Sequence, residues 1–277
     1  MPEKLPLNVL LTKKCNARCR FCVEETNERT TDRLNWQEFA LKINSMIGRK
    51  EVTDVLLLGG EPLYFPGIID LVRALEVSPI ITTNGHRLAH NPKFLHDFKI
   101  LPLQALNISI EHYDPKKRDL LARTSLYEND EIVAAVKQLP FPVRINCLLL
   151  KGCIDSVGEI SKMAEFAAAT GAKELKIGEV TARNPQIHDF LNPEIIAFNH
   201  SHYVEIPDPV FRLKCHELGG THFWKEIAGV KVYFNSPPDY AQAGGRDKNG
   251  RHYHRVLFND GQIGFSWRRA DGLTNSI

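Results

Sequence analysis

Short apolar runs alternate with amphipathic segments along the first 180 residues of the chain. Continuous apolar runs predict buried strands, and apolar residues spaced three or four apart predict helices. Strands are expected at residues 9–12, 54–58, 79–83, 105–110, 143–150 and 174–180. Helices are expected between them, at residues 36–47, 67–75, 92–98, 114–122, 130–139 and 156–169. Asn35 is a suitable N-cap for the first of these helices.

The expected strands are runs of Val, Ile and Leu rather than strict apolar–polar alternations. Such strands are typical of a parallel sheet that is covered by helices. Repeated strand–helix units predict an α/β sheet or barrel, and six units are too few for a complete eightfold barrel. We therefore expect an α/β fold, an incomplete (β/α)6 TIM-like barrel, over residues 1–190.

The pattern changes after about residue 190, where prolines interrupt any helix. Strands are expected at residues 230–234 and 255–258. Asn259-Asp260-Gly261 predicts a hairpin turn that leads into a strand at residues 263–265. Residues 191–277 are thus expected to form a β-rich extension that caps the barrel and selects the substrate.

Composition narrows the function classes. The chain carries 35 basic and 33 acidic residues, a formal net charge of +2, which argues against a general nucleic-acid coat or a polybasic membrane binder. Its apolar runs, such as residues 55–58, are too short to span a bilayer. Residues 1–7 lack the apolar stretch of a signal peptide. We expect a cytoplasmic protein with neither a membrane nor a nucleic-acid partner.

Three of the six cysteines, Cys15, Cys19 and Cys22, lie within eight residues, directly after the first expected strand. In barrel folds this end of a strand belongs to the face that carries the active site. A structural zinc ion needs four ligands, so a fourth would have to come from another cysteine or a histidine. A cubane iron–sulfur cluster held by three cysteines instead leaves one iron open to a further ligand.

Glycine or polar side chains follow the other expected strands. These segments are Gly59-Gly60-Glu61-Pro62, Thr82-Thr83-Asn84-Gly85, Ser109, Asn146 and Glu179-Val180-Thr181. Glycine allows close approach of the backbone to a ligand, and Glu61 can accept hydrogen bonds from an ammonium group. Three of these segments also have a simpler interpretation: a tight turn for Gly59, Gly60 and Asn84, or a hydroxyl bonded to the backbone for Ser109.

Taken in order, these segments resemble the radical S-adenosylmethionine (SAM) superfamily over residues 8–181. The resemblance implies a [4Fe-4S] cluster on Cys15, Cys19 and Cys22, whose open iron chelates SAM. It also implies SAM contacts by the residues that match the family's motifs: Phe21, Gly59, Gly60, Glu61, Asn84, Ser109, Asn146 and Thr181. Electron transfer from such a cluster cleaves SAM to a 5′-deoxyadenosyl radical, with a donor such as flavodoxin or ferredoxin.

Within the superfamily, residues 144–152 look most like the GTP cyclase of molybdenum-cofactor biosynthesis, and more distantly like viperin-like enzymes. The chain departs from that cyclase at two points. Only Cys215 lies beyond residue 153, so the cyclase's second cluster is not expected. Asn8 occupies the position of an arginine that contacts GTP in the cyclase. GTP cyclisation is therefore not implied.

The C-terminal region bears on the substrate. A basic run over residues 246–255 and the pair Arg268-Arg269 are either solvated loops or a cationic wall for a phosphate or carboxylate. Cys215 is either a hydrogen-atom donor or inert, and Cys147 and Cys153 are expected to be small buried hydrophobes.

Three functions remain open. The first is hydrogen abstraction from a small, anionic, nucleotide- or sugar-like substrate. The second is radical modification of a peptide or protein side chain, including glycyl-radical activation. The third is a zinc-stabilised binding protein without catalysis.

Overall fold

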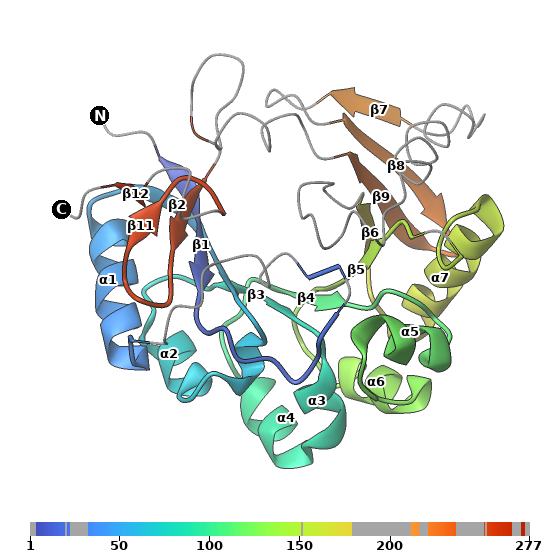
Figure 1. Cartoon of the computed structure of the whole chain (residues 1–277), viewed down its shortest axis with the longest axis horizontal. Helices are drawn as coiled ribbons and strands as arrows, with labels where there is room; N and C mark the ends of the chain where they lie inside the picture. Colours follow the sequence, from blue (N-terminus) through green and yellow to red (C-terminus); the bar gives the residue numbers. More distant parts are fainter. Residues whose placement is uncertain are drawn as a thin grey trace.

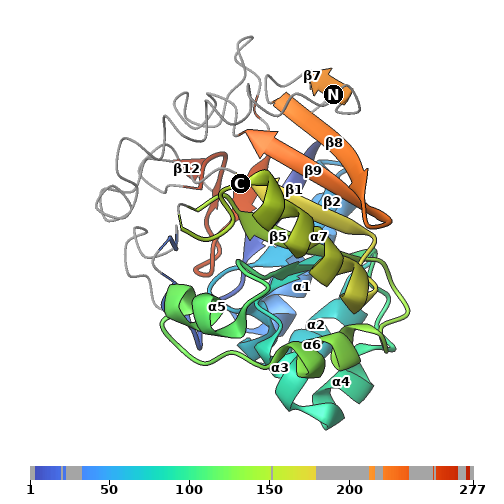
Figure 2. The same cartoon turned by 90° about the vertical axis from the view of Figure 1, so that its right-hand side faces the viewer.

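The computed structural model describes residues 4–19, 21–22, 33–150, 152–178, 212–215, 221–236, 252, 254–267 and 273–274. Its framework is one curved sheet whose strands lie inside an arc of helices (Figure 1). The view at right angles shows α5, α6 and α7 on the outer side of the strands (Figure 2).

Six parallel strands form the centre of this sheet. They are β1 (Leu5–Leu10), β2 (Val52–Leu58), β3 (Ile80–Thr83), β4 (Ala105–Ser109), β5 (Val143–Leu148) and β6 (Glu174–Gly178). The helices are α1 (Trp36–Gly48), η2 (Pro62–Tyr64), α2 (Ile68–Ala74), α3 (His86–His90), α4 (Pro92–Phe98), α5 (Pro115–Ala122), α6 (Asn129–Val136) and α7 (Val157–Thr170).

The six strands pair in chain order, β1 to β6, and each pairing is parallel. The sheet does not close on itself, because its two edges are occupied by further strands. The prediction of an incomplete (β/α)6 barrel is therefore confirmed.

The described C-terminal strands extend the same sheet at both edges. At one edge β9 (Val230–Ser236) lies parallel to β6, followed by β8 (Thr221–Ile227) and β7 (Arg212–Cys215). At the other, β10 (Arg255–Leu257) lies parallel to β1, followed by β11 (Ile263–Gly264) and β12 (Leu273–Thr274). The hairpin between β10 and β11 is confirmed, with Gly261 at a φ of +87°. The boundary at residue 190 stays a prediction.

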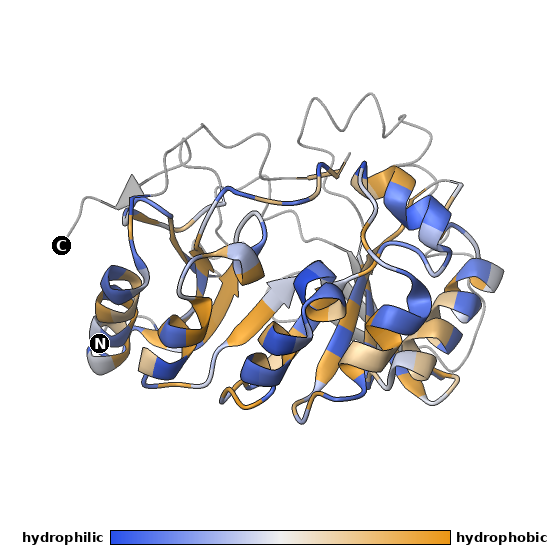
Figure 3. Ribbon diagram, turned by 90° about the horizontal axis from the view of Figure 1, so that it is seen from below, coloured by the Kyte–Doolittle hydropathy of each residue, from blue (hydrophilic) through white to orange (hydrophobic). Residues whose placement is uncertain are grey.

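Alternating side chains divide the sheet into two faces. Val143, Ile145 and Cys147 of β5 are buried in the main core between the sheet and the helices. The intervening residues, Arg144 and Asn146, are only partly buried and face the inner side, opposite the described helices. The hydropathy colouring shows largely apolar strands and helices with alternating apolar and polar stripes (Figure 3). Helix burial against this sheet is thus the main apolar contribution to folding.

Two local differences from the predictions have physical reasons. Strand β1 ends at Leu10, because residues 12–14 leave the sheet to bond the loop after β2. Helix α3 was not expected, since five residues are too few to show a helical period. Helix α1 begins as predicted, with a capping box in which Asn35 Oδ1 accepts from the Glu38 amide. Within the described part of the chain, no helix combines the length and the apolar character that crossing a bilayer requires.

We predict that Phe98→Ala lowers the free energy of unfolding by about 3–5 kcal/mol. Phe98 is fully buried, and its ring lies 5.5 Å from that of Phe94 and 5.8 Å from that of Phe141. Ile100→Ala is the matched control, because Ile100 is 64% exposed and its truncation should cost about 0.5 kcal/mol or less. Urea unfolding followed by circular dichroism measures both. Equal losses in the two variants would contradict this core assignment.

Candidate active site

The cysteine loop leaves the C-terminal end of β1 and is held by backbone hydrogen bonds. The Lys14 amide donates to Thr12 Oγ1 (3.0 Å), and the Ala17 amide donates to Cys15 Sγ (3.3 Å). A turn follows, in which the Cys22 amide donates to the Cys19 carbonyl (3.1 Å). The loop is also tied to the end of α5 by the Arg18 amide, which donates to the Ala122 carbonyl (2.9 Å).

The structure brings the three predicted thiols into one neighbourhood. Cys15 is exposed, and Cys19 and Cys22 are partly buried. Partial desolvation of the Cys15 thiol, together with the charges of Glu61 and Cys22, raises its pKa to about 11. Burial also raises the pKa of Cys19 to about 12, with Glu111, Cys22 and Cys15 adding to the effect. Three thiols that disfavour one another's negative charge need positive charge between them to act as thiolates.

This donor set fits an iron–sulfur cluster better than a single metal ion. Among the described residues, no group of three or more His, Cys, Asp or Glu side chains is arranged to hold one ion. A zinc ion draws its sulfur ligands to about 2.3 Å from one centre. A cluster bonds each thiolate to a different iron and therefore suits thiols that are neighbours without converging on one point. The residues present thus fit a cluster with three cysteine ligands.

Gly59 and Gly60 are required by contact between two loops. The Gly60 amide donates to the Thr12 carbonyl (2.6 Å), and the Glu61 amide donates to the Lys14 carbonyl (2.9 Å). A Cβ atom on Gly59, whose φ is +137°, would lie 2.6 Å from the Thr12 oxygen. A Cβ atom on Gly60 would overlap the backbone of Lys13 and Lys14. The glycines thus admit the cysteine loop, and their predicted approach to a ligand stays a prediction.

The Glu61 carboxylate links the loop after β2 to the loop after β3. It is buried and accepts hydrogen bonds from the Leu63 amide (3.0 Å), the Thr83 hydroxyl (2.5 Å) and the Asn84 amide (2.7 Å). Burial raises its pKa to about 6, while these three donors favour the ionised form. Its described contacts are therefore structural ones.

Asn84 completes the connection to the cysteines. Its Nδ2 donates to Asn16 Oδ1 (2.8 Å), and Asn16 directly follows Cys15. Its Oδ1 accepts from the His86 amide at the start of α3 (3.0 Å). The loops after β1, β2 and β3 are thus joined through Gly60, Glu61 and Asn84, and we call this set of contacts the loop interlock.

The other predicted cofactor contacts lie along the same edge of the sheet. Ser109 and Asn146 are register neighbours on β4 and β5, and both are partly buried. Phe21 packs in a small apolar cluster with Leu121, Leu148 and Leu150. Thr181, the side chain of Cys215 and most of the basic run lie outside the described residues. The described end of the basic run is not a solvated loop. His254 is buried, and its ring lies 5.4 Å from that of Trp267. Arg255 is the first residue of β10.

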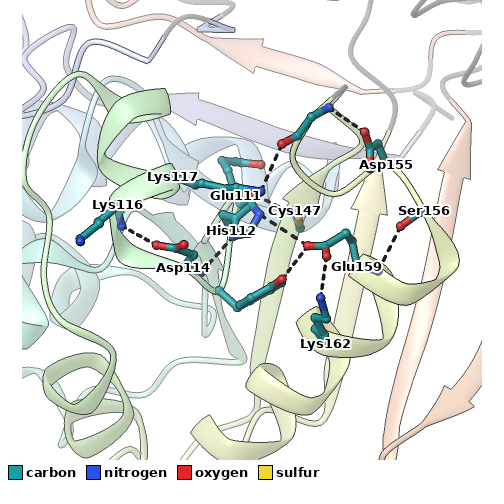
Figure 4. Close-up of polar contacts among 12 residues, drawn as sticks. Glu111, His112, Asp114, Lys116, Lys117, Cys147, Asp155, Ser156, Glu159 and Lys162 are labelled. Atoms are coloured by element: carbon teal, nitrogen blue, oxygen red, sulfur yellow. Dashed lines mark hydrogen bonds and ion pairs between the residues drawn. The ribbon is translucent and has the colours of Figure 1, made fainter.

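Sequence reasoning missed Glu111, which comes two residues after Ser109. Its Oε2 accepts from the Leu148 amide (2.7 Å), burial raises its pKa to about 8, and its charge helps to raise the pKa of Cys19. Its place just beyond a strand end was a signal that could have identified it. Figure 4 shows Glu111 beside Cys147.

A second polar group fixes the loop after β4 against α7 (Figure 4). His112 is fully buried, its Nδ1 accepts from the Asp114 amide (2.9 Å), and its Nε2 lies 3.8 Å from Glu159 Oε2. Glu159 also accepts from Tyr113 Oη (2.6 Å) and Lys162 Nζ (2.8 Å). These contacts hold the segment that carries Glu111.

Comparison with protein families gives a match to the model described as the Radical SAM superfamily, over residues 9–167, more than half of the chain. The chain is 34% identical over 176 residues to the probable GTP 3′,8-cyclase of Thermococcus kodakarensis, covering 60% of this chain and 53% of the relative. It is 29% identical over 180 residues to human molybdenum cofactor biosynthesis protein 1, covering 62% and 27%. The matched part thus spans about half or less of these relatives.

Solved structures share the fold. Streptococcus suis SuiB bound to S-adenosylmethionine matches with a TM-score of 0.66 at 13% identity, covering 99% of this chain and 63% of that one. The structure of anSMEcpe with bound AdoMet matches with a TM-score of 0.53, also at 13% identity, covering 93% and 73%.

We predict that Gly60→Ala destabilises the protein by about 1–3 kcal/mol, because the new methyl group displaces the cysteine loop. The amount of iron that this variant binds after anaerobic reconstitution should also decrease. Gly48→Ala is the control, since a Cβ at Gly48 meets nothing within 4 Å. Thermal unfolding and iron content are measured on both variants. A Gly60→Ala protein with the stability and iron content of the Gly48→Ala protein would rule out the backbone contact.

Glu61→Gln should cost about 1–3 kcal/mol, because an amide offers one acceptor oxygen where the carboxylate offers two. If the NH₂ group of the new glutamine took the place of Oε2, it would face the N–H group of Asn84. Glu165→Gln serves as the control, since Glu165 is exposed on α7. Urea unfolding at neutral pH should separate the two variants. If both variants are as stable as the parent, the Glu61 link does not hold the loops together.

Proposed function

The chain belongs to the radical SAM superfamily, whose members use a [4Fe-4S] cluster and SAM, and we propose that it is an enzyme of this kind. Cys15, Cys19 and Cys22 would hold the cluster, which when bound would supply the electron for cleavage of SAM into methionine and a 5′-deoxyadenosyl radical, the species that would abstract hydrogen from a substrate C–H bond. The observation that carries the proposal is the gathering of three thiols on one loop that the loop interlock holds in place.

The remaining site residues would bind SAM and orient the cysteine loop. Ser109 and Asn146, on adjacent strands, face the side on which SAM would lie, and Phe21 and Leu148 supply apolar surface that excludes water. Gly60 and Glu61 position the loop, and the acceptor site that three protein donors leave on the Glu61 carboxylate would receive the SAM ammonium group. Asn84 aligns the loop through Asn16. Thr181 keeps its proposed place beside the adenine on the strength of its motif.

We propose a small anionic substrate, nucleotide- or sugar-like. Two observations support this class: relatives named GTP 3′,8-cyclase, and cationic side chains on the inner face of β5 and β6. Residues 191–277 would close over this face, with flavodoxin or ferredoxin as electron donor in the cytoplasm. The alternative is modification of a peptide or protein side chain. A closed basic pocket in a crystal structure of the reconstituted protein would favour the anion, and an open groove would favour the peptide.

Anaerobic reconstitution with reductant and SAM should give 5′-deoxyadenosine, and Cys19→Ala should abolish it, because the cluster loses one of its three ligands. Cys153→Ala is the control for removal of a thiol, since Cys153 lies outside residues 15–22 and packs with Leu121 and Leu150 in an apolar cluster. The product is quantified by chromatography. Wild-type yields from Cys19→Ala would falsify the cluster assignment.

A further inference from the structure

Arg144 occupies an unusual place for an arginine, in the middle of the parallel sheet. It is the second residue of β5, between the buried Val143 and Ile145. Its Nε donates to Asn146 Oδ1 (3.2 Å), two residues further along the strand. Alternation places both side chains on the inner face, opposite the helices.

This hydrogen bond orients the guanidinium through Nε and does not use the two terminal nitrogens, Nη1 and Nη2, which we call the fork. Among the residues that the structure describes, Arg144 makes no hydrogen bond through Nη1 or Nη2. Its register partner Glu174 accepts from Tyr233 Oη (3.3 Å) instead. Desolvation lowers the pKa of Arg144, and Glu174 offsets part of that effect.

A second cation lies beside it. Lys176 on β6 is the register partner of Asn146. Burial lowers the pKa of Lys176 to about 8, and the charge of Arg144 lowers it further. The positive charge of Arg144 thus has a second cationic side chain next to it on the adjacent strand.

We propose that the Nη1–Nη2 fork of Arg144 binds an oxyanion of the substrate, a phosphate or a carboxylate group. The inference rests on the proposed function and adds an anchoring residue to it. A guanidinium fork matches both groups through two parallel hydrogen bonds. Asn146 Oδ1 orients the guanidinium by accepting from Arg144 Nε, so the Nδ2 group of Asn146 can face the side on which SAM would lie.

The depth of Arg144 suits this role. It lies two residues, about 6–7 Å along the strand, before Asn146, on the side away from the cysteine loop. A substrate held there would lie further into the sheet than SAM. The anchor is also independent of Asn8, which stands where the cyclase has an arginine, and of the basic run at residues 246–255.

The test measures binding of two probes, inorganic pyrophosphate and citrate, to the reconstituted protein by anaerobic calorimetry. The variants are Arg144→Gln, which removes charge and fork, and Arg144→Lys, which keeps the charge. Arg73→Gln is the control, because Arg73 is exposed on α2. Thermal unfolding verifies that each variant is folded.

The proposal expects wild type and Arg73→Gln to bind at least one probe equally. Arg144→Gln should bind about tenfold or more weakly, and Arg144→Lys should fall between them. Binding of pyrophosphate alone assigns a phosphate, and binding of citrate alone a carboxylate. No binding by wild type, or wild-type affinity in Arg144→Gln, overturns the anchor. Since formation of 5′-deoxyadenosine by wild type is measured separately, its absence would refute the proposed function instead.

Discussion

The contact between two backbone loops is the constraint on which the site depends. The carbonyls of Thr12 and Lys14 accept from the amides of Gly60 and Glu61, and no side chain fits between them. This contact pulls the chain out of β1 before the first cysteine and sets the direction of the cysteine loop. These hydrogen bonds join backbone atoms, so the sequence must meet only one requirement: positions 59 and 60 must be glycine, which has no Cβ.

Rigidity at the site comes from a buried charge that the protein itself satisfies. The Glu61 carboxylate accepts three hydrogen bonds, and Asn84 extends the connection to Asn16 beside Cys15. A buried carboxylate that accepts three hydrogen bonds costs far less than an isolated one. The cysteines therefore lie on a loop that is anchored at three strand ends, while the partly polar inner face remains for ligands.

The sequence was sufficient for the central strands and for α1, because the apolar period and the capping residues are local signals. The thiol trio is predicted by cysteine spacing, which is also a local signal. The sequence was insufficient where a role depends on a distant partner. The sequence did not reveal that Glu61 accepts from the Thr83 hydroxyl, because the two residues lie 22 positions apart. Arg144 was read as part of an apolar strand, since its partial burial depends on β4 and β6. Strands β7 and β8 were missed because their polar composition gives no clear period.

Iron and sulfide content, together with Mössbauer spectra with and without SAM, tests the central claim most directly. The account predicts about four iron and four sulfide per chain, with one iron distinct from the others and altered when SAM is added. A chain that binds zinc without sulfide, or a cluster whose irons are all unaffected by SAM, would contradict it.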